Sequence, residues 1–145
     1  MNEQLQAAVE TLRPFINPRQ LKAMCSYCYG EEKQFFLKMF SELARIVSTM
    51  PKTYETDGQG DKAVAHLHYF AGGSDFYITE KDKGDGRDEV PGQQHQAFGL
   101  SDVFGDGGEL GYVSIAELIQ HKVELDLYWT PRTLAEIRKE RNRHD

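Results

Sequence analysis

The chain has 145 residues and a mass of 16.6 kDa, which suits one domain with a single hydrophobic core. Hydrophobic residues make up 39% and charged residues 28% of the sequence, and these shares exclude a disordered chain, a fibrous repeat and a disulfide scaffold. The net charge is -6, and residues 51–129 hold fifteen acidic against six basic side chains. An acidic surface repels phosphate backbones and attracts cationic proteins, so direct nucleic-acid binding is not expected.

The sequence shows no membrane or export signal. No stretch reaches the roughly 18 apolar residues of a membrane-spanning helix. The first residues, Met1-Asn2-Glu3-Gln4, lack the basic and apolar regions of a signal peptide. The only cysteines are Cys25 and Cys28, which fits a reducing compartment. We therefore expect a cytoplasmic protein that does not bind membranes.

The first fifty residues are predicted to be helical. Twelve of the 13 glycines lie in residues 58–111, so Gly30 is the only glycine in the N-terminal part. Pro14 ends a first helix, and Asn17-Pro18 starts a second one as N-cap and first-turn proline. The third helix follows Glu31-Glu32. The apolar stripes of the three helices are Leu5, Ala8, Val9 and Leu12; Leu21, Met24, Cys25 and Cys28; and Phe36, Met39, Phe40, Leu43, Ile46, Val47 and Met50.

Beyond residue 62 the hydrophobic period changes to two, which predicts strands. A turn at residues 71–74 joins the first two into an antiparallel hairpin. We expect residues 81–94, which are rich in charge and glycine, to form a loop. The predicted strands are 63–70, 75–80, 97–103, 110–113 and 123–129.

Two helices are predicted in the second half. Ser114-Ile115-Ala116-Glu117 is a capping box that starts a short helix, and Thr130-Pro131 is expected to cap the last one. The fold class is therefore α+β, with N-terminal helices packed on a mostly antiparallel sheet of about five strands. We expect a single domain, 1–145, with a helical part (1–50), a sheet-rich part (62–129) and a C-terminal helix (130–145).

The cysteines and histidines allow a metal site as an alternative. A redox role for Cys25-Ser26-Tyr27-Cys28 is disfavoured because the pair lies at the end of a predicted helix and not at its start. A zinc site could add His66 and His68, since residues two apart in a strand share a face.

The acidic segment 82–89 resembles a calcium loop only in composition. An EF-hand loop requires glycine at its sixth position and glutamate at its twelfth. A loop that begins at Asp82 or at Asp85 has neither. A solvated loop explains it better. No nucleophile elbow or phosphate-binding glycine loop occurs, so these enzyme classes are disfavoured.

Several segments in the second half of the chain follow an order and spacing that also occur in other proteins. They are Asp75-Phe76-Tyr77-Ile78-Thr79-Glu80, Ala97-Phe98-Gly99-Leu100, residues 109–118, residues 123–128 and Pro131-Arg132-Thr133-Leu134. Over about residues 64–137 their order and spacing resemble a family of small uncharacterised proteins from plasmid and phage accessory genes, often found near antirestriction genes. This chain has Leu125 where that family usually has arginine. The resemblance implies a mobile-element context and no particular activity.

Two functions are predicted as alternatives. The first is a non-enzymatic mobile-element protein, without a cofactor, whose acidic surface binds a basic protein partner and inhibits a host-defence complex of the restriction or CRISPR type. The second is a metal-dependent hydrolase or nuclease that uses His66 and His68 with Glu80 and Asp126. A homodimer is left open. The candidate binding residues of the first function are Tyr77, Glu80, Asp82, Asp85, Asp88, Glu89, Glu124 and Asp126.

The core is predicted to join the longest helix to the sheet, because neither apolar surface can stay exposed. Phe36, Phe40, Leu43 and Val47 should pack against Leu67, Ile78, Leu125 and Leu127. By contrast, neutralising Asp85 and Asp88 in the loop should hardly change stability.

Overall fold

The computed structural model describes residues 2–84 and 92–142. Three helices come first, as predicted, and capping explains where two of them begin. The Asn2 side chain accepts hydrogen bonds from the amides of Gln4 and Leu5, and Asn17 accepts one from the amide of Gln20. The helices are α1 (Glu3–Leu12), α2 (Pro18–Tyr27) and α3 (Lys33–Thr49). Two short 3₁₀ helices are η1 (Arg13–Phe15) and η2 (Gly60–Lys62).

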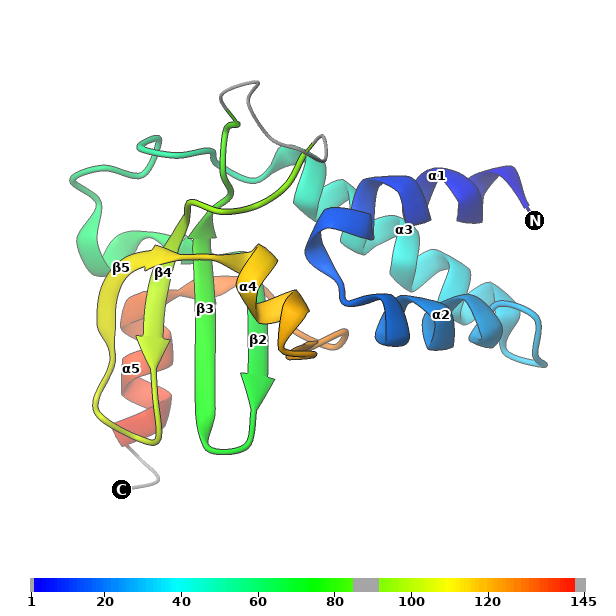
Figure 1. Cartoon of the computed structure of the whole chain (residues 1–145). Helices are drawn as coiled ribbons and strands as arrows, with labels where there is room; N and C mark the ends of the chain where they lie inside the picture. The colour runs from blue at the N-terminus through cyan, green and yellow to red at the C-terminus, as the bar shows by residue number, and fades with distance from the viewer. Residues whose placement is uncertain (1, 85–91, 143–145) are drawn as a thin grey trace.

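The second half contains a five-stranded antiparallel sheet in the order β5-β4-β3-β2-β6 (Figure 1). The predicted hairpin forms between β2 and β3, where Leu67 pairs with Ile78 and Ala71 with Ser74. Helix α4 (Ile115–Gln120) follows Ser114, whose hydroxyl accepts from the Glu117 amide as predicted. The strands are β1 (Val64–Ala65), β2 (Leu67–Ala71), β3 (Ser74–Glu80), β4 (Ala97–Asp102), β5 (Glu109–Val113), β6 (Glu124–Leu125) and β7 (Arg132–Thr133).

The prediction of a strand over residues 123–129 is wrong beyond Leu125. Asp126 starts a turn there, because its carboxylate accepts from the Tyr128 amide at 3.0 Å and its carbonyl accepts from the Trp129 amide at 3.4 Å. The prediction of one strand over residues 63–70 is also corrected. The strand is interrupted at His66, and the residues before it form β1, which pairs with β7 in a separate two-stranded sheet.

The start of the last helix differs from the prediction as well. Residues 130–133 are not helical, and α5 (Leu134–Asn142) begins after Thr133. The Thr133 amide donates to the Glu136 carboxylate, and the Glu136 amide donates to the Thr133 hydroxyl. This reciprocal capping box, which begins two residues after the proline, determines where the helix starts.

The sheet separates two clusters of buried side chains. Helices α1–α3 lie beyond the β2 end of the sheet, while α5 lies behind it (Figure 1). The main cluster contains Phe40, Leu43 and Val47 together with Leu67, Ile78 and Leu125, with Phe36 and Leu127 packed against it, so the predicted core is confirmed. The second cluster joins α5 to the sheet through Ala63, Ala65, Tyr77, Leu100, Leu134 and Ile137. Within residues 2–84 and 92–142, no helix is long and apolar enough to cross a membrane.

Candidate functional site

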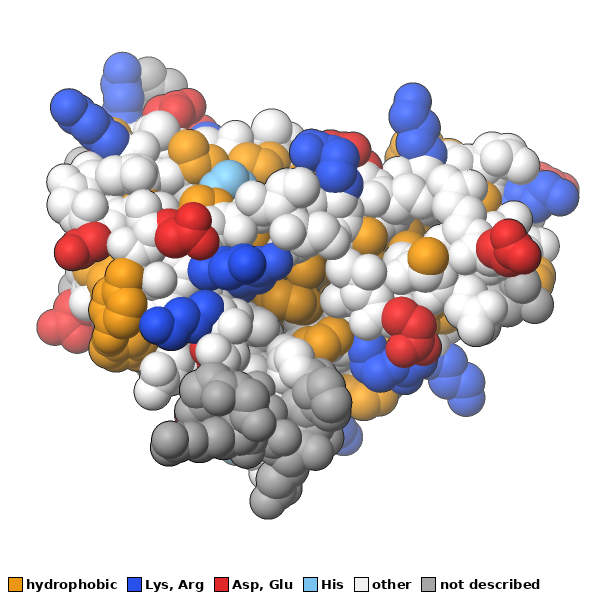
Figure 2. Space-filling model, turned by 90° about the horizontal axis from the view of Figure 1, so that it is seen from above, with side chains coloured by type: hydrophobic (Ala, Val, Ile, Leu, Met, Phe, Trp, Pro, Cys, Tyr) orange, Lys and Arg blue, Asp and Glu red, His pale blue; other side chains and the backbone are white. Residues whose placement is uncertain are grey.

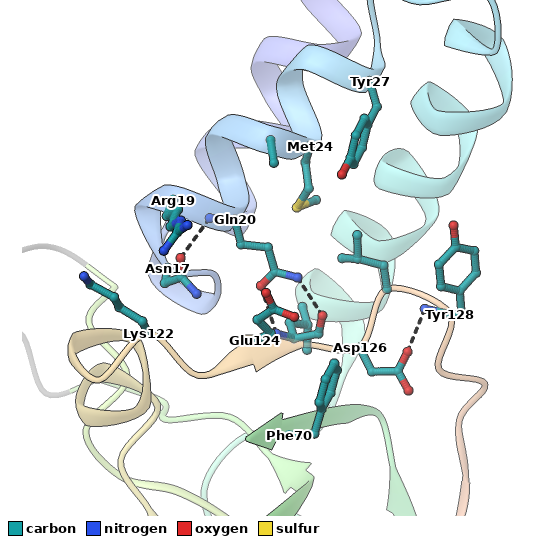
Figure 3. A pocket seen from close by; sticks show the side chains of 13 residues that line it. Asn17, Arg19, Gln20, Met24, Tyr27, Phe70, Lys122, Glu124, Asp126 and Tyr128 are labelled. Carbon is teal, nitrogen blue, oxygen red and sulfur yellow. Dashed lines mark hydrogen bonds between the residues drawn. The ribbon is translucent and has the colours of Figure 1, made fainter. Parts of the chain in front are cut away.

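A groove of about 490 Å³ runs between α2 and the edge strand β6 (Figure 3). Its lining includes Met24 and Leu125, which belong to the main core, so the base of the groove is rigid. Side chains from α2, from β2 and from residues 122–128 complete it. Three parts of the chain that are far apart in sequence therefore form one site.

Two side-chain amides hold α2 against β6. The Gln20 amide nitrogen donates to the Leu125 carbonyl at 2.7 Å, and its oxygen accepts from the Leu125 amide at 2.9 Å. Asn17, besides capping α2, donates to the Val123 carbonyl at 3.1 Å. Gln20 thus binds Leu125 as a neighbouring strand would, and it closes this edge of the sheet.

Aromatic side chains from three elements surround the groove. Tyr27 at the end of α2 is 46% exposed, Phe70 in β2 is 39% exposed, and Tyr128 after β6 is 70% exposed. Exposed aromatic rings around one concave site are typical of binding surfaces, because they offer large rigid contact areas.

The charged side chains are unevenly distributed along the groove. Arg19 and Lys122 lie at one end, Tyr27 and Tyr128 lie toward the other, and Glu124 lies between them (Figure 3). Glu124 is exposed and pairs with Phe70 across the β2–β6 ladder. Two of the predicted binding residues, Glu124 and Asp126, therefore both line this groove, together with Phe70 and Tyr128.

Asp126 is held in place by a histidine beneath it. His68 Nδ1 lies 3.0 Å from Asp126 Oδ2, and His68 Nε2 lies 2.8 Å from Asp75 Oδ1. The imidazole ring stacks on Tyr77 at 4.8 Å between centroids, so Tyr77 is a buried support and not an exposed contact. The pKa of the Tyr77 hydroxyl is raised above its ordinary value, mainly because the hydroxyl is buried.

Glu80, another predicted binding residue, is buried and hydrogen-bonded. Its carboxylate accepts from the amides of Tyr54 and Thr56, at 2.8 and 2.9 Å, and from the Thr56 hydroxyl. An irregularity in the β3–β4 register between Ile78 and Glu80 marks a bulge, which redirects the Glu80 side chain. Glu80 therefore fixes residues 54–56 and does not face the groove beside α2.

The predicted acidic loop is only partly within the described residues. Asp82 accepts hydrogen bonds from the amides of Gly84, His95 and Gln96, so its carboxylate organises the two ends of the loop. Asp85, Asp88 and Glu89 lie outside the described residues.

Among the residues predicted for the metal sites, the structure brings His68 and Asp126 into contact, but the cysteines lie elsewhere. Cys25 and Cys28 are free thiols against the main core, whereas His68 stacks on Tyr77 of the second cluster. Burial and the neighbouring Cys25 raise the pKa of the Cys28 thiol, and burial lowers the pKa of His66. Within the described ranges, no three His, Cys, Asp or Glu side chains form a group that could hold a metal ion.

A second hollow, of about 400 Å³, lies between residues 54–60, β4, β5 and the start of α5. Tyr54 at its rim has a φ of 73°, a strained conformation for a tyrosine. Its amide is held by Glu80, and its hydroxyl lies 2.7 Å from the hydroxyl of Tyr112. The buried carboxylate therefore stabilises a strained loop over this hollow.

Sequence reasoning missed most of the groove. Gln20, Tyr27, Phe70 and Tyr128 did not stand out, because nothing in the local sequence shows that α2 meets β6. The only local signal was the Asn17-Pro18 cap, which orients the start of α2.

Charges of both signs are interspersed over the face of the molecule seen in Figure 2. The acidic surplus of residues 51–129 is partly internal, since Glu80 and Asp102 are buried. In comparisons with protein-family models, curated proteins and solved structures, nothing matches this chain. The groove between α2 and β6 is therefore identified from its own geometry.

Proposed function

We propose that this chain is a non-enzymatic protein-binding module, and that it binds a basic segment of a partner protein in the groove between α2 and β6. The observation that carries the proposal is the placement of Glu124 and Asp126 among three exposed aromatic side chains. A lysine or arginine side chain of the partner would interact favourably with the carboxylates and with the aromatic rings.

The energetics favour a cationic side chain. A cation over an aromatic ring gains about 0.5–2 kcal/mol, and a guanidinium or ammonium donates charge-assisted hydrogen bonds to a carboxylate. Asp126 already contacts His68, so Glu124 is the carboxylate with more freedom to bind. The net charge of -6 adds a longer-range attraction for basic partners.

We further propose that the partner is a host-defence complex and that the chain serves a mobile element. This part rests on the sequence resemblance over about residues 64–137. Such complexes carry basic channels for nucleic acid, and an acidic protein that occupies one would block it.

A peptide titration tests the groove. A peptide of alternating glycine and arginine is titrated calorimetrically into the full chain, the Glu124→Gln variant and the Glu109→Gln variant. Glu109 is an exposed acid on β5, so its variant makes the same charge change away from the groove. We expect Glu124→Gln alone to weaken binding by about fivefold, or ~1 kcal/mol. Equal affinities for both variants would contradict the proposal.

A plating assay tests the host-defence part separately. Cells with an active restriction system express the wild-type chain or Glu124→Gln, and the plating efficiency of an unmodified phage is measured. We expect the wild type to raise plating and Glu124→Gln to raise it less. No rise with the wild-type chain would contradict the anti-restriction role even if the peptide binds.

A further inference from the structure

The two edges of the five-stranded sheet are treated differently. At β6 the Gln20 and Asn17 side chains hydrogen-bond to the outer backbone groups. At the other edge, β5 pairs only with β4, and no other described residue hydrogen-bonds to the backbone of Glu109–Val113. An open edge of this kind is a template for another strand.

The side chains of β5 do not protect it. Natural edges are usually blocked by lysine, proline or a bulge, and β5, with the sequence Glu-Leu-Gly-Tyr-Val, has none of these. Leu110 is 42% exposed and Tyr112 is 58% exposed. The edge therefore offers apolar area together with unpaired backbone groups.

Gly111, at the middle of β5, is not explained by contacts within the chain. Its partner across the ladder, Gly99, must be glycine, because a Cβ there would lie 1.9 Å from the Tyr77 carbonyl oxygen. A Cβ on Gly111 would meet nothing within 4 Å. Glycine weakens a strand, and within a strand it often marks the close approach of another backbone.

We infer that β5 is a dimerisation edge, and that two copies of this chain pair their β5 strands antiparallel about Gly111. In this register Leu110 of one copy lies opposite Tyr112 of the other, and the two Gly111 residues face each other. Among antiparallel registers of two β5 strands, this is the one in which every residue of β5 has a partner in the second copy. The result is a continuous sheet through both copies.

Charge is compatible with this register. Glu109 is the only charged residue of β5, and it falls opposite Val113 of the second copy. The two Glu109 residues are then about 13 Å apart along the strands, beyond the screening length of about 8–10 Å at ordinary salt. The pairs of Leu110 with Tyr112 are of the aliphatic–aromatic type that stabilises neighbouring strands.

Substitutions at Gly111 test the inference without disturbing the fold, because the position has open space. The mass of the full chain is measured by light scattering over a range of concentrations. We expect the wild type and Gly111→Ala to rise from 16.6 kDa toward twice that mass. Gly111→Glu places two carboxylates directly opposite each other, and we expect it to remain monomeric with an unchanged circular dichroism spectrum. A wild type that stays at 16.6 kDa, or a Gly111→Glu variant that dimerises equally well, would overturn the inference.

Cross-linking tests the register. Under mild oxidation Gly111→Cys should form a disulfide-linked dimer at least about tenfold faster than Gly73→Cys, because pairing raises the effective thiol concentration. Gly73 lies in the β2–β3 turn, where a Cβ would also fit, at 3.6 Å from Phe104. The wild-type chain controls for Cys25 and Cys28. Equal rates for the two variants would overturn the proposed pairing.

Discussion

The two faces of the sheet are stabilised by different kinds of interaction. The main cluster, shared with α1–α3, consists of apolar side chains such as Phe40, Leu67 and Ile78. The face under α5 carries charges as well: Asp102 is paired with Arg141, and Arg132 lies 4.1 Å over the Trp129 ring. Apolar burial is non-directional, whereas ion pairs and hydrogen bonds depend on geometry.

This difference determines how each region should respond to substitution. Removing atoms from the apolar cluster leaves a cavity, and the cost grows with its volume. Removing a polar group on the other side leaves its partners buried without hydrogen bonds, and the cost is their desolvation.

Phe40→Ala should have the largest effect, because the ring is buried at the centre of the main cluster. We expect a loss of about 3–5 kcal/mol in the free energy of unfolding, measured by urea denaturation. Phe35→Ala is the matched control, since Phe35 lies in the same helix but is 55% exposed. Equal losses for the two variants would contradict the assigned core.

Glu80→Gln should cost about 2–3 kcal/mol, because one oxygen that accepts from Thr56 is replaced by an amide donor. Hydrogen exchange at residues 54–56 should also become faster. Glu55→Gln, which changes an exposed carboxylate that accepts from the Lys52 amide, is the control. If residues 54–56 stayed as protected in Glu80→Gln as in the wild type, Glu80 would not be what holds this loop.

Tyr69→Phe tests a polar contact within the apolar face. The buried Tyr69 hydroxyl donates to the Phe15 carbonyl at 2.5 Å, so its removal should cost about 1–2 kcal/mol by thermal or urea unfolding. A cost as large as that of Phe40→Ala would mean that hydrogen bonding, and not apolar burial, dominates this face.

The smallest expected effect is the pH dependence from His66. Burial lowers the pKa of folded His66 below its ordinary 6.5, so the unfolded chain binds this proton more readily. The free energy of unfolding should therefore decrease as the pH drops below 6.5. Above that pH the contribution of His66 to stability should be complete. Denaturation curves of the wild type and His66→Gln on both sides of this pH measure the difference. An identical pH dependence in the two proteins would contradict it.

The α+β class, the N-terminal helices and the β2–β3 hairpin could be predicted from the sequence, because their signals are local. Asn17 and Ser114 cap the helices that follow them, and the change of period after residue 62 separates helix from strand. The prediction failed where a turn or cap used side chains outside the hydrophobic pattern, as at Asp126 and Thr133.

The candidate site depended on tertiary contacts. Glu124 and Asp126 could be proposed as binding residues from their charge, but their aromatic neighbours Tyr27 and Phe70 come from elements distant in sequence. Gln20 meets Leu125 across 105 positions. Hydrophobic periodicity shows which side of an element is buried, and only the packing of whole elements determines which polar groups meet.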